Sequence, residues 1–197
     1  MRRNPRRRSA LVNAAIEVLA RDGARGLTFR AVDAAADVPA GTASNYFPTR
    51  DELLHQAGTQ VHERLGPDPT ELARTLRTPP SRELVTLLMR QLIDRILDDR
   101  VGYLALLELR LEAARQPRLH AALAQTLRAN LDFNIRNHAD LGMPGDQMSV
   151  VTLYLAISGL VVELLTVPEV MDRFDLDDLV AELVARAIPD DGNRAAT

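Results

Sequence analysis

The chain has 197 residues, with 24 basic and 27 acidic side chains and no cysteine. This length can hold one small and one larger domain, and the lack of cysteine excludes disulfide bridges and thiolate metal sites. Residues 1–50 carry nine Arg against four acidic residues, whereas residues 51–197 carry fifteen Arg against twenty-three. A basic N-terminal part suits a protein that meets phosphate groups there. The N-terminus is too charged for a signal peptide, so we expect a cytoplasmic protein.

The chain begins with a basic segment, because five of the first eight residues are Arg. We expect residues 1–5 to form an arm that can enter the minor groove of DNA. The alternative is that this segment is a solvated chain end. Asn4 and Pro5 can also cap the first helix, which would place Arg6 to Arg8 on its first turn.

Residues 27–54 predict two short helices around a tight turn, followed by the start of another helix, which is the layout of a helix-turn-helix. Thr28 can cap the first helix, whose N-terminal N–H groups can also bind a phosphate. The alanine-rich run that follows allows a second helix to approach closely at a steep angle. Asp37 stands where the chain must turn and tolerates a left-handed backbone, and Pro39 suits the first turn of the next helix.

The helix predicted from Pro39 to Phe47 carries short side chains that can lie against base edges in a major groove. After it, Thr49 and Glu52 match a capping box that begins a further helix, with Arg50 in its first turn. The helix dipole opposes a cation at that position, and a phosphate partner would explain Arg50.

This stretch resembles the DNA-binding domain of the TetR family of one-component transcriptional regulators. The residues on the family's pattern across the turn, the recognition helix and the next helix start are Gly41, Thr42, Tyr46, Phe47, Arg50 and Leu53. Upstream, the residues that resemble the family's first helix and its stop are Leu11, Ala14, Ala15, Ile16, Val18, Leu19 and Gly23. The resemblance implies an N-terminal three-helix DNA-binding domain over residues 6–66.

Three residues depart from the family's pattern. Asp37 stands where Gly is usual, Pro39 where a capping Ser is common, and Ser44 where a phosphate-contacting Tyr is common. Because Ser44 cannot reach a phosphate as a Tyr does, we interpret Ser44 and Asn45 as base or water-mediated contacts.

The resemblance implies phosphate anchoring by Thr28, Thr42, Tyr46 and Arg50. We expect Phe47 to lie in the core, and Tyr46 to pack its ring with the hydroxyl outward. The full set of expected DNA contacts is Thr28, Arg30, Ala40, Gly41, Thr42, Ser44, Asn45, Tyr46 and Arg50.

The rest of the chain, residues 67–197, predicts a larger helical domain for effector binding and dimerisation. Prolines interrupt any regular helix between Gly66 and Pro80, so this segment is predicted to be a loop or a short-helix linker. Leucines at helical spacing then predict three helices, over residues 81–99, 101–115 and 117–141. Since no strand-like alternation occurs, the fold should be all-α.

Residues 148–167 are long and apolar enough to suggest a membrane span, but Glu163 would be costly inside a bilayer. We prefer a helix buried on nearly every side, which packs its own domain and a second subunit at once. With a helix over residues 175–188, two copies would form a four-helix dimer bundle. The expected interface residues are Leu155, Gly159, Val162, Leu176, Leu179, Val180 and Leu183.

Polar residues on the predicted helices of the second domain are candidates for an effector pocket, which needs a few polar groups among apolar walls. They are Tyr103, Arg110, Asn130, Asn134, His138 and Tyr154. The alternative is a solvated helix face or a polar group satisfied in the core. His55 and His62 lack the partners of a metal site and are expected to be plain surface or hinge-facing histidines. We expect no metal and no cofactor.

The sequence therefore predicts a homodimeric, ligand-responsive transcriptional regulator. We expect a repressor that leaves a palindromic double-stranded DNA operator when a small-molecule effector binds. No catalytic constellation is recognisable, so we do not expect an enzyme and we expect no membrane partner. The alternatives are a helical module that acts through protein contacts, or an enzyme of unrecognised type.

Overall fold

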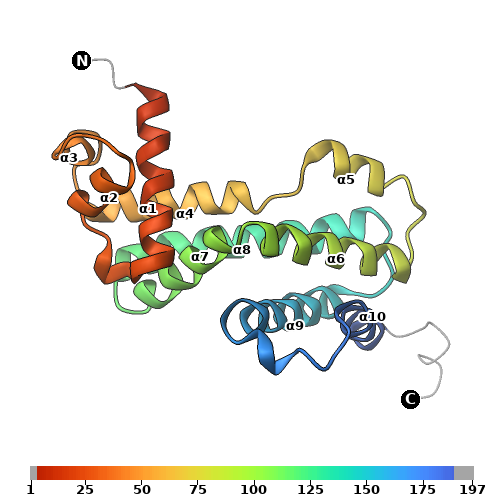
Figure 1. Ribbon diagram of the computed structural model, residues 1–197. Coiled ribbons are helices and arrows are strands. Elements are labelled where there is room, and N and C mark those ends of the chain that lie inside the picture. The colour runs from red at the N-terminus through yellow and green to blue at the C-terminus, as the bar shows by residue number, and fades with distance from the viewer. Residues whose placement is uncertain (1–3, 189–197) are drawn as a thin grey trace. The chain divides into compact units, whose positions relative to one another are not determined.

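The structure, a computed structural model, describes residues 4–188, and within this range it contains helices and no strand. The all-α prediction is confirmed. The elements in chain order (Figure 1) are α1 (Pro5–Gly26), α2 (Phe29–Ala35), α3 (Thr42–Tyr46), α4 (Arg50–Arg64), α5 (Pro69–Thr75), α6 (Arg82–Asp98), α7 (Arg100–Ala113), α8 (Pro117–Asp140), α9 (Gln147–Thr166), the 3-10 helix η1 (Pro168–Val170) and α10 (Leu176–Ala187).

The helices form two compact units that alternate along the chain. The first unit comprises the described residues up to Gly66 together with Asp99–Thr126, and the second comprises Pro67–Asp98 with the described residues from Leu127 onward. The first unit therefore holds α7 and part of α8 in addition to the predicted DNA-binding domain of residues 6–66. How the functions divide between these segments stays a prediction.

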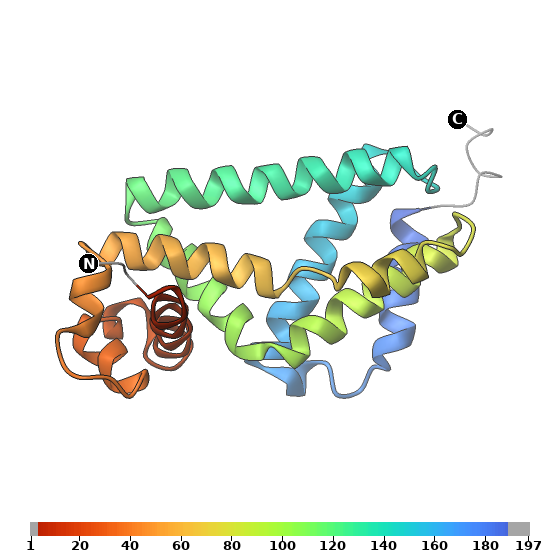
Figure 2. The ribbon, with the colours of Figure 1, turned by 90° about the horizontal axis from the view of Figure 1, so that it is seen from above.

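The first unit is built around α1, which packs against α2, α4 and α7. Figure 2 shows α1 end-on, with α2 and α3 folded beside it. The predicted cap is confirmed, since the Asn4 side chain accepts hydrogen bonds from the N–H groups of Arg6 at 3.0 Å and Arg7 at 3.4 Å. Arg2 and Arg3 of the predicted arm lie outside the described residues.

Near its end, α1 is kinked at Gly23, which has a φ of 70°. A side chain would be strained there, and a Cβ would lie 3.1 Å from Oε2 of Glu108 on α7. The same oxygen accepts a hydrogen bond from the N–H of Ala24 at 3.2 Å. The end of α1 is thus held by a carboxylate from a distant part of the sequence.

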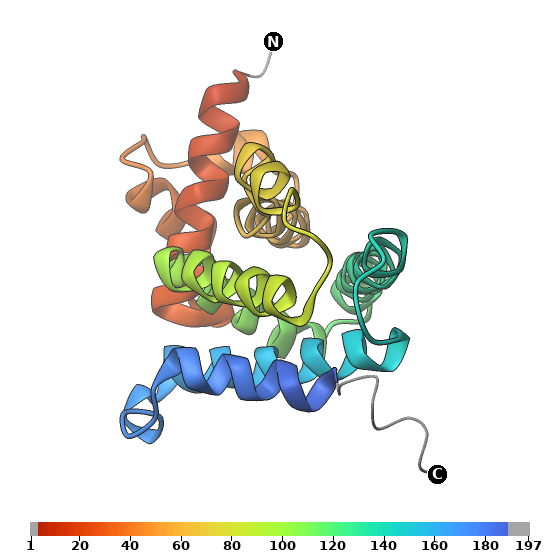
Figure 3. The same cartoon turned by 90° about the vertical axis from the view of Figure 1, so that its right-hand side faces the viewer.

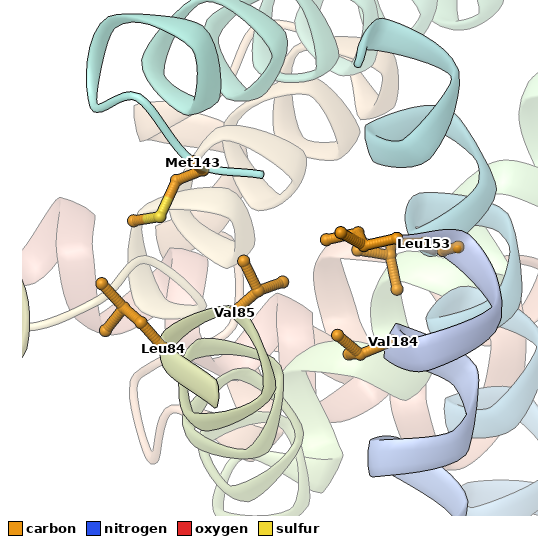
Figure 4. Close-up of a cluster of buried hydrophobic side chains, with 7 residues drawn as sticks. Leu84, Val85, Met143, Leu153 and Val184 are labelled. Carbon is orange, nitrogen blue, oxygen red and sulfur yellow. The ribbon is translucent and has the colours of Figure 1, made fainter. Parts of the chain in front are cut away.

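The second unit closes around an apolar cluster from α6, α9, α10 and the chain after α8 (Figure 4). Its buried members are Leu84, Val85, Met143, Leu153, Val184, Ala187 and Ile188. Figure 3 shows α9 and α10 side by side, which agrees with their packing. The predicted linker contains the short helix α5, capped by the side chain of Asp68. The three leucine-spaced helices and the two C-terminal helices are all present, with ends within two residues of those predicted.

By length and composition α9 could cross a membrane, and it is the only helix of residues 4–188 for which this is true. One face is buried and includes Leu153, Ile157, Val161 and Leu165. The opposite face is open, with Leu155 63% exposed. The expected burial of this open face by a second subunit stays a prediction.

Candidate DNA-binding surface

The helix-turn-helix begins as the sequence predicts. Thr28 lies in extended backbone before α2, and its hydroxyl accepts a hydrogen bond from the N–H of Ala31 at 3.1 Å. Asp37 has a φ of 50°, so the predicted left-handed turn residue is confirmed. The turn closes when the N–H of Val38 donates to the carbonyl of Asp33 at 3.0 Å.

The recognition helix is shorter than predicted. It runs from Thr42 to Tyr46, and Pro39 lies in the turn before it instead of in its first turn. The reason is Gly41, whose left-handed backbone (φ 88°) interrupts any helix that would start at Pro39. The carbonyl of Pro39 accepts a hydrogen bond from the N–H of Thr42 at 3.1 Å.

A residue that the sequence analysis did not identify anchors this turn. Asp33 on α2 is only 3% exposed, and its carboxylate accepts hydrogen bonds from two backbone N–H groups. Oδ2 lies 2.7 Å from the nitrogen of Gly41, and Oδ1 lies 2.6 Å from the nitrogen of Ala43. An acid inside an alanine-rich helix was the available signal, but its partners follow only from the fold.

The expected base-contacting residues lie on an accessible surface. Ala40, Gly41, Ser44 and Asn45 are exposed, whereas Ala43 between them is fully buried. The hydroxyl of Ser44 donates to the carbonyl of Gly41 at 2.9 Å. A hydroxyl whose hydrogen is engaged in this way still offers lone pairs to a base amino group.

Two residues expected to hold phosphates, Thr42 and Tyr46, are the ends of this helix and are partly buried. A third, Thr28, is exposed before α2, as is the expected DNA contact Arg30. The hydroxyl of Thr42 donates to the carbonyl of Pro39 at 2.5 Å, so a bond from this hydroxyl to a phosphate would require its hydrogen to turn outward.

Arg50, also expected at a phosphate, has partners within the first unit. Its Nε donates to the carbonyl of Leu27 at 3.1 Å, its Nη1 to Oε1 of Glu112 at 3.3 Å, and its Nη2 to the carbonyl of Ala24. About a third of the Arg50 side chain is exposed. These acceptors satisfy the cation that the helix dipole opposes. A phosphate partner is therefore not required to explain why Arg50 stands at the start of α4.

Arg8, which was predicted on the first turn of the first helix, also contacts the end of the recognition helix, and this contact was not predicted. Nη1 of Arg8 donates to the carbonyl of Tyr46 at 3.0 Å, and its guanidinium lies 4.5 Å from the ring centroid of Phe47. Phe47 is fully buried, as predicted. Nη2 of Arg8 binds Glu52 at 3.3 Å. Thr49 caps α4 through the N–H of Glu52, but in place of the return bond of a capping box, the Glu52 side chain binds Arg8 and Gln56.

The six expected effector residues are divided between the two units. Tyr103 and Arg110 belong to the first unit, and the other four belong to the second. Asn134 donates to Asn130 at 3.2 Å, and Nε2 of His138 lies 2.9 Å from the carbonyl oxygen of Pro144. The first contact lies within α8, and the second joins α8 to the loop that follows it.

The first unit contains a small, partly open cleft between α4, α7 and α8. None of the six expected residues lines it. The lining residues are Leu54, His55, Gly58, Thr59, Leu109, Leu119, Ala122, Leu123 and Thr126. His55 is exposed, as expected for a surface histidine, and it is one of three polar side chains that line this cleft. Within residues 4–188 no three His, Cys, Asp or Glu side chains are grouped as metal ligands would be.

The expected dimer residues differ in accessibility. Leu155 and Gly159 on α9 are exposed, and a Cβ placed on Gly159 would meet no atom within 4 Å. Leu183 on α10 is half-buried. Val180 is fully buried in its own chain, which leaves it no surface for a second subunit.

Comparisons with known proteins cover most of the chain. Residues 11–57 match the family described as bacterial regulatory proteins, tetR family, and residues 80–190 match the tetracyclin repressor-like C-terminal domain. No match was found among curated proteins.

Solved structures of similar fold span nearly the whole chain. A TetR family member from Streptomyces coelicolor A3 is 27% identical, with a TM-score of 0.69 over 94% of this chain and 99% of that one. The multidrug binding protein EbrR, complexed with imidazole, is 29% identical, with a TM-score of 0.65 over 94% of this chain and 97% of that one. EbrR has also been solved with ethidium, at 28% identity and a TM-score of 0.64 over 93% of this chain and 99% of that one.

Proposed function

Because the chain belongs to the TetR family and is a DNA-binding transcriptional regulator, we propose that it is a cytoplasmic repressor that binds a palindromic operator as a homodimer and leaves it when a small molecule binds. The observation that carries the DNA contact is the exposed surface of α3. Its exposed side chains, Ser44 and Asn45, are small, and they follow the one buried residue, Ala43, which fixes the helix to the unit beneath. A short helix of this kind can approach base edges closely.

The open face of α9 supports the homodimer. Met148 and Leu155 are 62% and 63% exposed and lie two turns apart on one side of the helix. Gly159 follows on the same side, where a second helix could approach closely. A soluble protein seldom leaves such apolar groups in water, and two-fold symmetry matches the two halves of a palindrome.

The cleft between α4, α7 and α8 supports an effector site. Its walls are apolar, and His55, Thr59 and Thr126 supply a few hydrogen-bonding groups, as small-molecule sites usually do. The structures of EbrR with ethidium and imidazole show that a protein of similar fold binds small molecules. A molecule bound against α4 would favour one position of this helix, which directly follows the recognition helix. If that position does not suit DNA binding, linkage requires the molecule to bind more weakly to the DNA-bound form.

The test of the proposed function is sequence selection with the purified protein, followed by footprinting of the selected site. We expect a palindrome of two half-sites about one helical turn apart, bound with an affinity that falls steeply with salt. Absence of any salt-dependent DNA affinity would favour the alternative of a protein-contact module.

Asn45→Ala is expected to weaken binding to the selected operator by about 1–3 kcal/mol and to leave binding to random DNA nearly unchanged. The exposed amide can form a bidentate contact with an adenine, and its loss removes sequence reading only. Titration of both DNAs with wild type and variant measures the difference. Equal losses on both DNAs would make Asn45 a backbone contact.

Ala122→Phe is expected to remove the response to the effector while operator binding stays near normal. Ala122 lines the cleft, and a larger side chain there would fill space that the ligand needs. The measurement is operator affinity with and without an inducing compound found by screening. Ala121→Phe is the matched control, because its neighbour Ala121 is exposed and is not among the lining residues. Unchanged induction of Ala122→Phe would place the effector elsewhere.

A further inference from the structure

The recognition helix α3 has no cap of its own. Its N-cap position is Gly41, which has no side chain, and Pro39 two residues earlier has no hydroxyl or carboxyl group to offer. The first N–H groups of a helix have no partner inside the helix and need one from outside. At five residues, α3 is also too short for its internal hydrogen bonds to hold it in one orientation.

Asp33 supplies the missing partner from another helix. Its carboxylate lies on α2, is 3% exposed, and accepts the N–H groups of Gly41 at 2.7 Å and Ala43 at 2.6 Å. Bonds of this length to an ionised acceptor are stronger than ordinary amide bonds. A buried carboxylate without such donors would strongly destabilise the fold. The Asp33 carboxylate therefore needs the two N–H groups as much as they need an acceptor.

We propose that Asp33 is a positioning residue for DNA reading: its carboxylate replaces the local N-cap and fixes the direction of α3 before DNA is bound. The proposal rests on the proposed DNA contacts of α3. It concerns a residue for which no DNA contact is expected. Asp33 acts through Gly41 and Ala43, which lie on either side of Thr42 and directly before Ser44 and Asn45.

The arrangement of the turn supports a role in orientation beyond folding. The left-handed Gly41 is the joint at which α3 leaves the turn, and one of the two bonds holds its N–H. The other bond holds the N–H of Ala43, the one buried residue of α3. Because these two N–H groups are held in the free protein, the base-contacting side chains need not be ordered when DNA binds. The entropy cost of specific binding is therefore lower. Contacts to phosphates elsewhere depend less on this orientation.

The test uses the full-length protein and its selected operator. Asp33→Ala is expected to lower the ratio of operator affinity to random-DNA affinity about tenfold, with the salt slope on random DNA unchanged. Asp33→Asn keeps one acceptor oxygen and should fall between wild type and Asp33→Ala. Asp51→Ala is the matched control, because it removes an exposed carboxylate from the same unit.

A rescue variant separates orientation from general stability. Pro39→Ser in the Asp33→Ala background places a hydroxyl near the N–H groups of residues 41 and 42, where a local cap could form. This double variant should recover part of the lost selectivity. If it does not, and Asp33→Asn also behaves as Asp33→Ala does, the lost selectivity does not come from the cap and the positioning role is overturned.

Amide NMR tests the contact without DNA. In wild type, the amide protons of Gly41 and Ala43 should be shifted downfield and exchange slowly, and Asp33→Ala should abolish both effects. Unchanged amide signals in Asp33→Ala would overturn the cap, whatever the DNA titrations show. Altered amide signals with unchanged selectivity would overturn the positioning role. A wild type with the amide signature but without any operator preference would overturn the DNA reading by α3 instead. If Asp33→Ala unfolds the first unit, the same comparisons are made with Asp33→Asn.

Discussion

Leu155→Glu is expected to convert the protein to a monomer and to abolish tight operator binding, while weak and salt-sensitive binding to any DNA remains. The side chain is 63% exposed on α9, so a charge there costs little within one chain. In a dimer the same carboxylate would be buried without a partner, at a cost of several kcal/mol. Each monomer would then read one half-site, and the loss of the second half-site removes most of the specific affinity. Light scattering and operator titration on one sample measure both effects.

Gly159→Leu sharpens this test. No atom of the chain lies within 4 Å of a Cβ placed there, and leucine favours helix more than glycine does. The substitution should therefore stabilise an isolated chain, and only a second chain could be obstructed. Leu111→Glu is the control, since Leu111 is another exposed leucine, 56% accessible, on α7. If Leu155→Glu and Gly159→Leu both stay dimeric and bind the operator normally, the dimer is built on another surface.

Arg50→Ala is expected to lower the free energy of unfolding by about 2 kcal/mol even without DNA. The change leaves the carboxylate of Glu112 without its guanidinium and two carbonyls, of Ala24 and Leu27, without a donor. Glu112 is only 14% exposed, so water replaces the lost partner poorly. Chemical denaturation followed by circular dichroism measures the loss. Arg50→Lys should recover little of it, because one ammonium cannot reproduce the three-way contact of a guanidinium.

The same variant tests the proposed phosphate contact. A guanidinium has five N–H donors, and three acceptors in the first unit leave some of them available. If Arg50 also holds a phosphate, Arg50→Ala should reduce the salt slope of DNA binding by about one unit. Glu112→Ala is the control, since it removes the internal partner and should leave the slope unchanged. An unchanged slope in Arg50→Ala would restrict Arg50 to its structural role.

The features predicted well from the sequence are those set by neighbours in the chain. Local propensity was enough to predict the helix caps at Asn4 and Thr28 and the left-handed turn at Asp37, because each involves only residues within about one turn. Leucine spacing predicted α6, α7 and α8 for the same reason. Pro39 shows the limit, because a left-handed Gly41 two residues later overrides the preference of proline for a first helical turn.

The features that were missed join residues far apart in the sequence. Asp33 and Ala43 are 10 residues apart, Arg8 and Tyr46 are 38 apart, and Arg50 and Glu112 are 62 apart. Each pair exists only after the helices have packed, so periodicity could not reveal it. The expected effector residues stay a prediction, because a pattern on α8 does not tell which helix will face it.

The interleaving of the two units bears on how such regulators can be recombined. An exchange of DNA-binding specificity would naturally be attempted by grafting residues 1–66 onto another regulator. Here that graft would leave behind α7, whose Leu109 is fully buried in the first unit and whose Glu108 and Glu112 hold the end of α1 and the start of α4. A foreign α7 would have to supply matching carboxylates and a matching apolar face. We therefore expect chimeras joined near residue 66 to fold poorly, and chimeras that carry Asp99–Thr126 along with the N-terminal helices to keep their new specificity.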